Sequence, residues 1–549
     1  PMGHGAEDFK YRFQWNFPIF FSPHNPNKLY AASNHLHAST DQGASWQLIS
    51  PDLTRNDPTK LGSSGGPITQ DNTSVEYYCT IFAAAESPLV EGLLYTGSDD
   101  GLVHISQDGG KSWTNITPKD WPQWMMVNSI EPSRHEPGTC YVAGTRYKLG
   151  DYTPYLYKTS DYGNSWQRIT KGIESEHFTR VLREDLTQRG LLYAGTEAGM
   201  YVSFDDGAQW QKFQLNLPQV PITDLTLKNN DLIVATQGRS LWMIDDLTVL
   251  HQLRNAKGNQ NFLFKPKDTY RIGGRSRSGS LTQGTNHPNG VMVYFTLADP
   301  EHSEVSLSFL NLNNDTLKRF SNKDKKNKLE VKKGHNLMVW DLKGEGAERL
   351  DGMILWWAST EAPKAVPGNY SVVLQVGDQV MRRPFSIVAD PNSETDQMGM
   401  QRQFDFISSV NSTVDKAHKS IKKIRGINGQ LKEFKSRYEN TPSVAELVEN
   451  ATELSKQFTE IEEALYQTKN RSGQDPLNFP IKLTNKLAHL NALVGMDDFP
   501  PTQQDIAVKN ELTQAIEGEL NKLNGLIDKE IKAFNAAFRN MSLDYLFVE

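Results

Sequence analysis

The sequence predicts a multidomain, mainly β protein that ends in helices, and three patterns predict it. A short turn sequence recurs four times before residue 250. Apolar and polar residues then alternate over 261–389, as expected of half-buried strands. After residue 395 the apolar residues keep the three–four spacing of amphipathic helices. A chain of 549 residues also exceeds what one hydrophobic core organises, so roughly two to four domains are expected.

The repeated turn follows the pattern S/T-x-D-x-G-x-x-W, and we call its four copies the tryptophan turns. They span Ser39–Trp46, Ser106–Trp113, Thr159–Trp166 and Ser203–Trp210. Their tryptophans lie 67, 53 and 44 residues apart, which indicates a structural repeat. The aspartate can accept backbone N–H groups, the glycine permits a positive φ, and the tryptophan can pack beneath neighbouring strands. We therefore interpret these residues as fasteners of hairpins and not as catalytic groups: Asp41, Trp46, Asp108, Trp113, Asp161, Trp166, Asp205 and Trp210.

Four strands can be counted around each turn. The segment "EGLLYTGSDDGLVHISQDGGKSWTNI" aligns with "RGLLYAGTEAGMYVSFDDGAQWQKF", and an apolar strand precedes each of them. A fifth repeat keeps the strands and lacks the turn. Four antiparallel strands per repeat is the arrangement of a β-propeller blade. Residues 1–250 are therefore predicted to form five blades, near 14–50, 76–118, 124–170, 177–214 and 220–248.

The strand order of a blade sorts its loops onto two rims. If a tryptophan turn joins the third and fourth strands, the turn between the second and third strands lies on the opposite rim, together with the connection to the next blade. That opposite rim collects the irregular segments 50–74, 117–126 and 146–155. The first is far longer than the usual connection of about 2–6 residues, which favours a functional loop.

Aromatic and charged residues gather in these segments, with Trp121 and Trp124 expected to be exposed beside prolines. Rigid aromatic surfaces beside arginine are typical of protein or sugar binding. The alternative is that the turns are polar simply because they are turns, and that Trp121 or Trp124 caps a blade. The candidate binding residues are His35, Arg55, Asp99, Asp100, Trp121, Trp124, Arg146, Tyr147, Tyr152, Glu197 and Arg239.

The rest of the chain predicts a β-sandwich over 259–390 and an antiparallel helical bundle over 395–549. Segments such as "NGVMVYFTL" and "NLMVWDLKG" alternate as strands do, and the hairpin around Gly377 resembles the last hairpin of an immunoglobulin-like or fibronectin-like sandwich. Short links between amphipathic helices imply antiparallel packing. A capping box from Ser443 to Glu446 is expected to open the second helix.

Composition and charge exclude several classes of protein. A hydrophobic content of 37% indicates a globular chain, and the net charge of -7 comes with no basic stripe, so no nucleic-acid partner is expected. Cys79 and Cys140 can form at most one disulfide, and two buried free thiols are favoured. No apolar run reaches the roughly 18 residues of a membrane span. The chain lacks a signal peptide and enters a strand almost at once, which suggests a fragment or a processed chain.

The region to about residue 250 resembles the Asp-box (BNR) propellers of sortilin-type proteins, in particular the large "glycosyl hydrolase"-labelled sortilin-like proteins of Bacteroidetes. The segments "SPDLTRNDP", "SGGPIT", "VEYYCTIF" and "ATQGRSLWMIDD" carry the resemblance. It implies a larger propeller array with further blades, and a self-contained ring of five blades is the alternative. It also implies an extracytoplasmic protein, which is periplasmic, secreted or at the cell surface.

Binding is favoured over catalysis. An inverting glycosidase needs two carboxyl groups about 6.5–9.5 Å apart, whereas Asp99, Asp100 and Glu197 are expected on blades separated by another. A glycoside hydrolase of the sialidase or xyloglucanase type stays the alternative. No zinc spacing, P-loop or GxGxxG is found, so neither cofactor nor metal is expected. The expected partner is a protein or peptide, with an N-terminal half of the same protein, an outer-membrane complex and a glycan as candidates.

Overall fold

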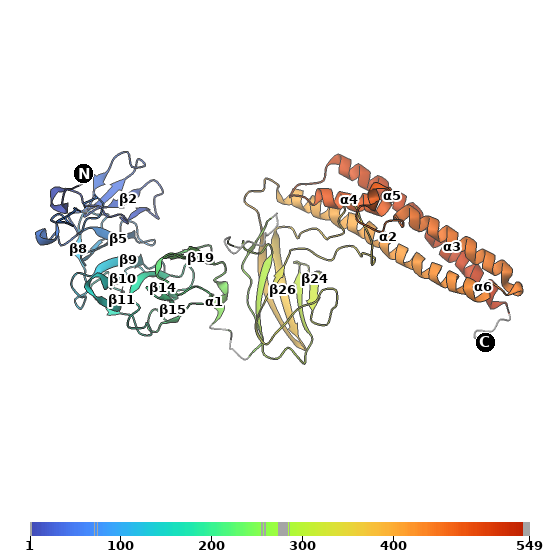
Figure 1. Cartoon of the computed structure of the whole chain (residues 1–549), viewed down its shortest axis with the longest axis horizontal. Helices are drawn as coiled ribbons and strands as arrows, with labels where there is room; N and C mark the ends of the chain where they lie inside the picture. The colour runs from blue at the N-terminus through green and yellow to red at the C-terminus, as the bar shows by residue number, and fades with distance from the viewer. Residues whose placement is uncertain are drawn as a thin grey trace. The chain divides into compact units, whose positions relative to one another are not determined.

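Two compact units make up the chain in a computed structural model (Figure 1). The structure describes residues 3–541, except 71, 74, 254–255, 257–259, 273–283 and 285. Along the chain, the boundary between the two units lies between Leu247 and Thr248. The second unit holds both the strands and the helices that the sequence predicts beyond residue 259 as two separate domains.

The first unit is a run of five small antiparallel sheets, each made of strands that are consecutive in the chain. The first four sheets have four strands and the fifth has three. The strands are β1 (Ile19–Phe21), β2 (Leu29–Ala32), β3 (Leu36–Ser39) and β4 (Gln47–Leu48); β5 (Ile81–Glu86), β6 (Leu94–Ser98), β7 (Val103–Ser106) and β8 (Thr114–Asn115); β9 (Met126–Pro132), β10 (Cys140–Arg146), β11 (Asp151–Thr159) and β12 (Gln167–Arg168); β13 (Thr179–Glu184), β14 (Leu192–Thr196), β15 (Gly199–Ser203) and β16 (Gln211–Lys212); and β17 (Ile222–Lys228), β18 (Asp231–Thr236) and β19 (Leu241–Ile244).

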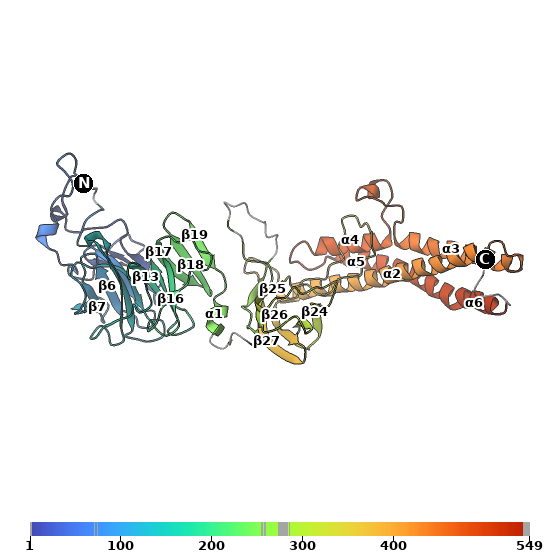
Figure 2. The same ribbon diagram turned by 60° about the horizontal axis from the view of Figure 1, so that its bottom comes forward.

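These sheets pack face to face in chain order (Figure 2). Strand β2 contacts β5, and the first strands β5, β9, β13 and β17 contact one another in turn. The second strand of each of the first four sheets carries a buried tyrosine, because alternate side chains of a central strand face a neighbouring sheet: Tyr30, Tyr95, Tyr141 and Tyr193. Four-stranded antiparallel sheets stacked through their first strands define a β-propeller-like unit.

The second unit begins with two packed sheets. The strands are β20 (Phe262–Leu263), β21 (Thr269–Arg271), β22 (Val291–Leu297), β23 (Val305–Leu310), β24 (Thr316–Ser321), β25 (Gly334–Trp340), β26 (Gly368–Val376) and β27 (Gln379–Ala389), after a short helix α1 (Thr248–Gln252). One sheet has the order β20-β22-β25 and the other β21-β27-β26-β23-β24. Both faces contribute to one core, in which the rings of Phe309 and Trp340 stack at 4.4 Å. An immunoglobulin-like or fibronectin-like class for these sheets stays a prediction.

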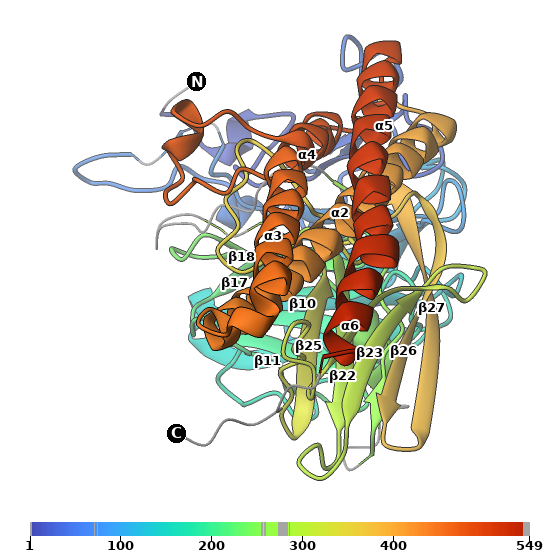
Figure 3. The ribbon, with the colours of Figure 1, turned by 90° about the vertical axis from the view of Figure 1, so that its right-hand side faces the viewer.

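Long helices complete the second unit, with α2 beside both α3 and α5 (Figure 3). They are α2 (Gln397–Tyr438), α3 (Ala445–Leu465), α4 (Leu483–Val494), α5 (Gln503–Gly525), a π-helical segment (Leu526–Ile531) and α6 (Lys532–Arg539). The capping box expected from Ser443 to Glu446 is wrong, because Pro442 starts a 3-10 turn that takes up Ser443 before α3 begins. A capping box forms instead between Thr502 and Asp505 at the start of α5.

Candidate binding rim

The two rims of the first unit hold different loops. On one rim each tryptophan turn lies beside the turn between the first two strands; for example, the N–H of Gly109 donates to the carbonyl of Gly92 at 3.0 Å. On the other rim, the turn between the second and third strands meets the connection that enters the sheet; the N–H of Glu197 donates to the carbonyl of Phe178 at 3.0 Å. We call this second edge the loop rim.

The aspartates of the tryptophan turns are hydrogen-bonded within their own turns. Asp161 accepts from the N–H and the hydroxyl of Ser165 at 2.8 and 2.6 Å, and from the hydroxyl of Thr159 at 2.8 Å. In Asp41 and Asp108 the same hydrogen bonds, chiefly from the hydroxyl of the serine four residues on, lower the carboxyl pKa to about 2. A carboxylate held ionised in this way stabilises a turn and is a poor proton donor.

Asp99 and Asp100 are predicted to face a partner, and the structure corrects this because both side chains are buried. Asp99 accepts from the N–H of Thr80 at 2.9 Å and from its hydroxyl at 2.8 Å. Asp100 accepts from the N–H of Arg55 at 2.8 Å, and Arg55 Nε donates to the carbonyl of Asp100 at 2.7 Å. Asp99 thus holds Thr80 at the entry to β5, Asp100 holds Arg55 in the 50–74 segment, and neither side chain reaches outward.

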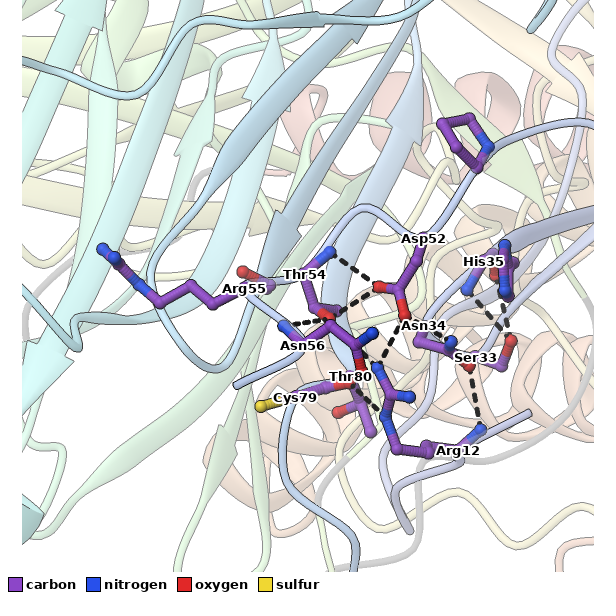
Figure 4. Close-up of polar contacts among 12 residues, drawn as sticks. Arg12, Ser33, Asn34, His35, Asp52, Thr54, Arg55, Asn56, Cys79 and Thr80 are labelled. Atoms are coloured by element: carbon purple, nitrogen blue, oxygen red, sulfur yellow. Dashed lines mark hydrogen bonds and ion pairs between the residues drawn. The ribbon is translucent and has the colours of Figure 1, made fainter. Parts of the chain in front are cut away.

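An ion pair between the buried Arg12 and the partly buried Asp52 organises the start of the loop rim (Figure 4). Arg12 Nη2 lies 2.8 Å from Asp52 Oδ2, and Arg12 Nε donates to the carbonyl of Cys79 at 3.1 Å. Asn34 donates to the same Asp52 oxygen at 2.8 Å. Sequence reasoning missed this group, because the two charges are 40 residues apart and neither belongs to a repeated pattern. It joins the N-terminal segment, the first β2–β3 turn and the 50–74 connection.

Four residues of the loop rim form a cation–π group, which we call the Trp124 patch: Arg55, Lys60, Tyr78 and Trp124. Arg55 Cζ lies 5.0 Å and Lys60 Nζ 5.8 Å from the centre of a Trp124 ring. The ring of Tyr78 lies 6.3 Å from that of Trp124. These distances are typical of attraction between a cation and an aromatic ring. The patch offers positive charge and flat apolar surface at one place.

Trp121 and Trp124 stand three residues apart in very different surroundings. Trp121 is 7% exposed and its ring lies 5.1 Å from that of Tyr157, so its predicted exposure is wrong and it caps the third sheet. Trp124 has a φ of 61°, an uncommon backbone conformation for a bulky residue. Asn56 and Cys79 in the neighbouring segments also have positive φ.

A second group, the Tyr147 patch, consists of Tyr147, Tyr152, Phe178, Arg180 and Glu197. The rings of Tyr147 and Phe178 stack at 5.1 Å, and Arg180 Cζ lies 5.5 and 5.2 Å from them. Arg180 Nε donates to Glu197 at 2.7 Å, which fixes the guanidinium against the rings. Tyr152 is exposed, with its ring 6.1 Å from that of Phe178. Phe178 and Arg180 were not among the predicted residues, since they follow an ordinary connection.

The other predicted residues lie on the loop rim outside both patches. His35 Nδ1 lies 3.1 Å from the carbonyl of Ser50. Arg146 forms an ion pair with Asp151 at 2.9 Å. Arg239 is exposed and donates to the carbonyl of Gly238 at 2.9 Å.

Asp99→Asn is expected to change the pH dependence of stability. Burial raises the pKa of Asp99 from 3.8 to about 7. The contribution of its neutral carboxyl to the stability of the folded protein is therefore fully present below pH 3.8 and is lost as the pH rises through 7. Asparagine does not titrate. The variant is therefore expected to be more stable than the parent at pH 8, by as much as about 4 kcal/mol, and close to it near pH 4. Thermal unfolding between pH 4 and 8 measures this.

Asp41→Asn is the control of opposite sign. The hydrogen bonds of Ser45 lower the pKa of Asp41 from 3.8 to about 2, so the stability given by its ionised form is present above pH 3.8 and is lost as the pH falls through 2. This variant is expected to be less stable than the parent at pH 8. A loss of stability at pH 8 in Asp99→Asn as well would contradict the assignment of a neutral carboxyl.

Among the residues that the structure describes, no group of three or more His, Cys, Asp or Glu could hold a metal ion. No helix in the described ranges combines the length and apolarity needed to cross a bilayer. Cys79 and Cys140 are both free and buried.

Comparison with known proteins adds no family. No protein-family model matches the chain, and no curated protein matches it. Similar solved structures include the GH74 xyloglucanase of Xanthomonas campestris, an ancestral GH74 enzyme and YCF48 bound to D1 peptide, at 16%, 13% and 15% identity and TM-scores of 0.31, 0.32 and 0.27. They are matched over 42%, 70% and 40% of this chain and 36%, 48% and 62% of their own, so the chain spans less than two thirds of each. The β-propeller-like assignment rests on the strand order and sheet packing of this chain.

Proposed function

We propose that the first unit binds a protein or peptide on its loop rim and acts as a binding or assembly scaffold. The observation that carries the proposal is the presence of two patches on this rim in which a guanidinium lies against aromatic rings. The few residues that dominate the binding energy of protein interfaces are enriched in Trp, Tyr and Arg. The two patches belong to neighbouring sheets, so one extended partner can engage both.

The carboxylates near the rim favour binding over glycoside hydrolysis. A glycosidase needs an acid and a second carboxylate that both reach the substrate. Asp99 and Asp100 are buried in hydrogen bonds, and Glu197 is paired with Arg180. A peptide ligand requires none of these groups to titrate or to leave its partner.

We further propose that the chain is of the sortilin type and works outside the cytoplasm, as its sequence resemblance implies. Fractionation of the source cells tests the location. The protein is expected in the periplasmic, surface or secreted fraction, and recovery in the cytosolic fraction alone would contradict this part of the proposal.

Trp124→Ala is expected to weaken peptide binding about thirty-fold, the loss of about 2 kcal/mol that is typical when a central tryptophan is truncated. Tyr152→Ala is expected to weaken it in the same direction. The probes are peptides selected from a random display library on the purified chain, and their dissociation constants are measured by calorimetry. Trp357→Ala is the matched control, since Trp357 is 74% exposed and belongs to the second unit.

A glycan arm separates binding from catalysis. Xyloglucan and sialylated oligosaccharides are incubated with the parent chain, Asp99→Asn and Glu197→Gln. No turnover is expected from any of the three. Turnover by the parent that disappears in either variant would contradict the scaffold proposal and indicate a glycoside hydrolase. Peptide binding that is unchanged in both Trp124→Ala and Tyr152→Ala would show that the loop rim is not the binding surface.

A further inference from the structure

The second, third and fourth sheets are each fastened to the sheet before them by their tryptophan turn. The indole N–H of the turn donates to the carbonyl of the isoleucine that follows the fourth strand of the preceding sheet. The three pairs are Trp113 to Ile49 at 2.9 Å, Trp166 to Ile116 at 2.7 Å and Trp210 to Ile169 at 2.6 Å. The same contact thus repeats at every junction between consecutive four-stranded sheets.

The glycine of the turn makes the second half of this contact. A Cβ on Gly163 would lie 2.6 Å from the side chain of Ile116, and a Cβ on Gly207 would lie 2.7 Å from that of Ile169. The missing side chain therefore lets the turn close over the isoleucine of the preceding sheet. Indole N–H and glycine together recognise one partner: an apolar residue just after a fourth strand, with an accepting carbonyl.

The first sheet carries the same turn with no such partner among the residues that the structure describes. Trp46 is 41% exposed, and no described carbonyl accepts from its indole. A Cβ on Gly43 would meet only the ring of Trp46 itself, at 3.5 Å or more. The recognition element is therefore complete in the first sheet and unused there.

On this side of the first sheet, apolar side chains are exposed on the outer strands β1 and β4, while Ala31 and His37 between them are buried and the ring of Phe13 stacks on that of His37 at 6.3 Å. Ile19 and Leu48 lie on the same face of the sheet, because Ile19 pairs with Ala31, Ala31 with His37 and His37 with Leu48 across neighbouring strands. Phe21 lies on that face as well, because it is two residues beyond Ile19. These three side chains are 58%, 48% and 61% exposed. The opposite face of the sheet packs on β5 and β6 through Tyr30, Ile81 and Leu94. Exposed apolar groups of this kind mark an interaction surface.

We propose that this face docks a further four-stranded antiparallel sheet from outside residues 1–549, with its closing isoleucine-like residue under Gly43 and that residue's carbonyl bonded to the Trp46 indole. The interface continues one that this chain forms three times. A second copy of the chain does not provide the partner from its last sheet, because β17–β19 has no fourth strand among the residues that the structure describes. The inference is independent of the loop rim, since the two surfaces share no residue.

Hydroxyl-radical footprinting of two samples tests the docking. One is the purified chain, and the other, the native assembly, is the protein isolated from its source cells together with the polypeptides bound to it. In the purified chain Trp46 is expected to oxidise several-fold faster than Trp113 and Trp166 at every protein concentration. In the native assembly its rate is expected to fall to theirs, while that of Trp357 stays high. Persistent reactivity of Trp46 in the assembly overturns the proposal, and protection that grows with the concentration of the purified chain alone overturns it in favour of a second copy.

A chain extended at its N-terminus by a second copy of residues 119–172 tests the chemistry of the occupant. The added sheet ends in the equivalent of Ile169 and is expected to protect Trp46 from oxidation. Ile169→Asp in the added copy is expected to abolish that protection, and protection that survives it overturns the proposed contact. Trp124 reports the loop rim in the same experiment, so a failure of this inference is distinguishable from a failure of the proposed function.

Discussion

Gly163→Ala is expected to lower the free energy of unfolding of the first unit by about 3 kcal/mol. About 1 kcal/mol comes from forcing a side chain onto a positive φ, and about 2 from overpacking at the sheet junction. Gly163 has a φ of 85°, and an added Cβ would lie 2.6 Å from the side chain of Ile116. Urea unfolding followed by tryptophan fluorescence measures the loss.

Gly43→Ala is the matched control for the sheet junction. Gly43 occupies the same place in its turn with a φ of 86°, but its Cβ would meet no neighbouring sheet. It is expected to cost only the backbone share, about 1 kcal/mol. Equal losses in the two variants would show that the glycine serves the turn alone and that the contact with Ile116 adds nothing.

Arg271→Ala is expected to destabilise the second unit by about 3–5 kcal/mol, the cost of leaving one member of a buried ion pair without its partner. Arg271 on β21 is buried, contacts Asp498, and donates to Gln403 on α2 at 3.0 Å and to the carbonyl of Ala365 at 3.1 Å. The side chain thus joins the sheets to the helices. Thermal unfolding of the whole chain, with hydrogen exchange to locate the loss, measures the effect.

Arg319→Ala is the control for charge alone. Arg319 pairs with Glu304 at 2.9 Å, and both side chains are about half exposed. Exposed pairs of this kind contribute less than about 1 kcal/mol. A loss as small for Arg271→Ala would mean that packing, and not this ion pair, holds the sheets against the helices.

The tryptophan turns could be predicted because their contacts are local. Asp161 finds all its donors within four residues, so the sequence pattern contains the whole interaction. Counting strands around such turns predicted four-stranded sheets, and the first four sheets have this strand number and order, whereas the fifth, which lacks the turn, has three strands. The indole contacts with Ile49, Ile116 and Ile169 span 41 to 64 residues, and no pattern inside one turn reveals them.

The candidate site was only partly predictable, because distant partners decided the outcome. Trp121 and Trp124 look alike in the sequence, but Trp121 is buried against Tyr157, whereas Trp124 has a positive φ and lies against Arg55 and Lys60. In the sequence, Asp99 and Asp100 look like exposed acidic residues of a turn. In the structure they accept hydrogen bonds from Thr80 and Arg55, which lie in other segments of the chain. Sequence reasoning could place the segments on one rim but not orient their side chains.

The separation of fasteners and variable loops onto opposite edges has an evolutionary consequence. The 146–155 insertion extends β10 and β11 and leaves the hydrogen bonds of Asp161 at the far end of the same sheet unchanged in type from those of Asp108. Loops on the loop rim can therefore be lengthened or exchanged without disturbing the contacts that the tryptophan turns make between the sheets. In such an architecture the binding specificity can change during evolution through the loops, while the residues that hold the sheets together stay the same.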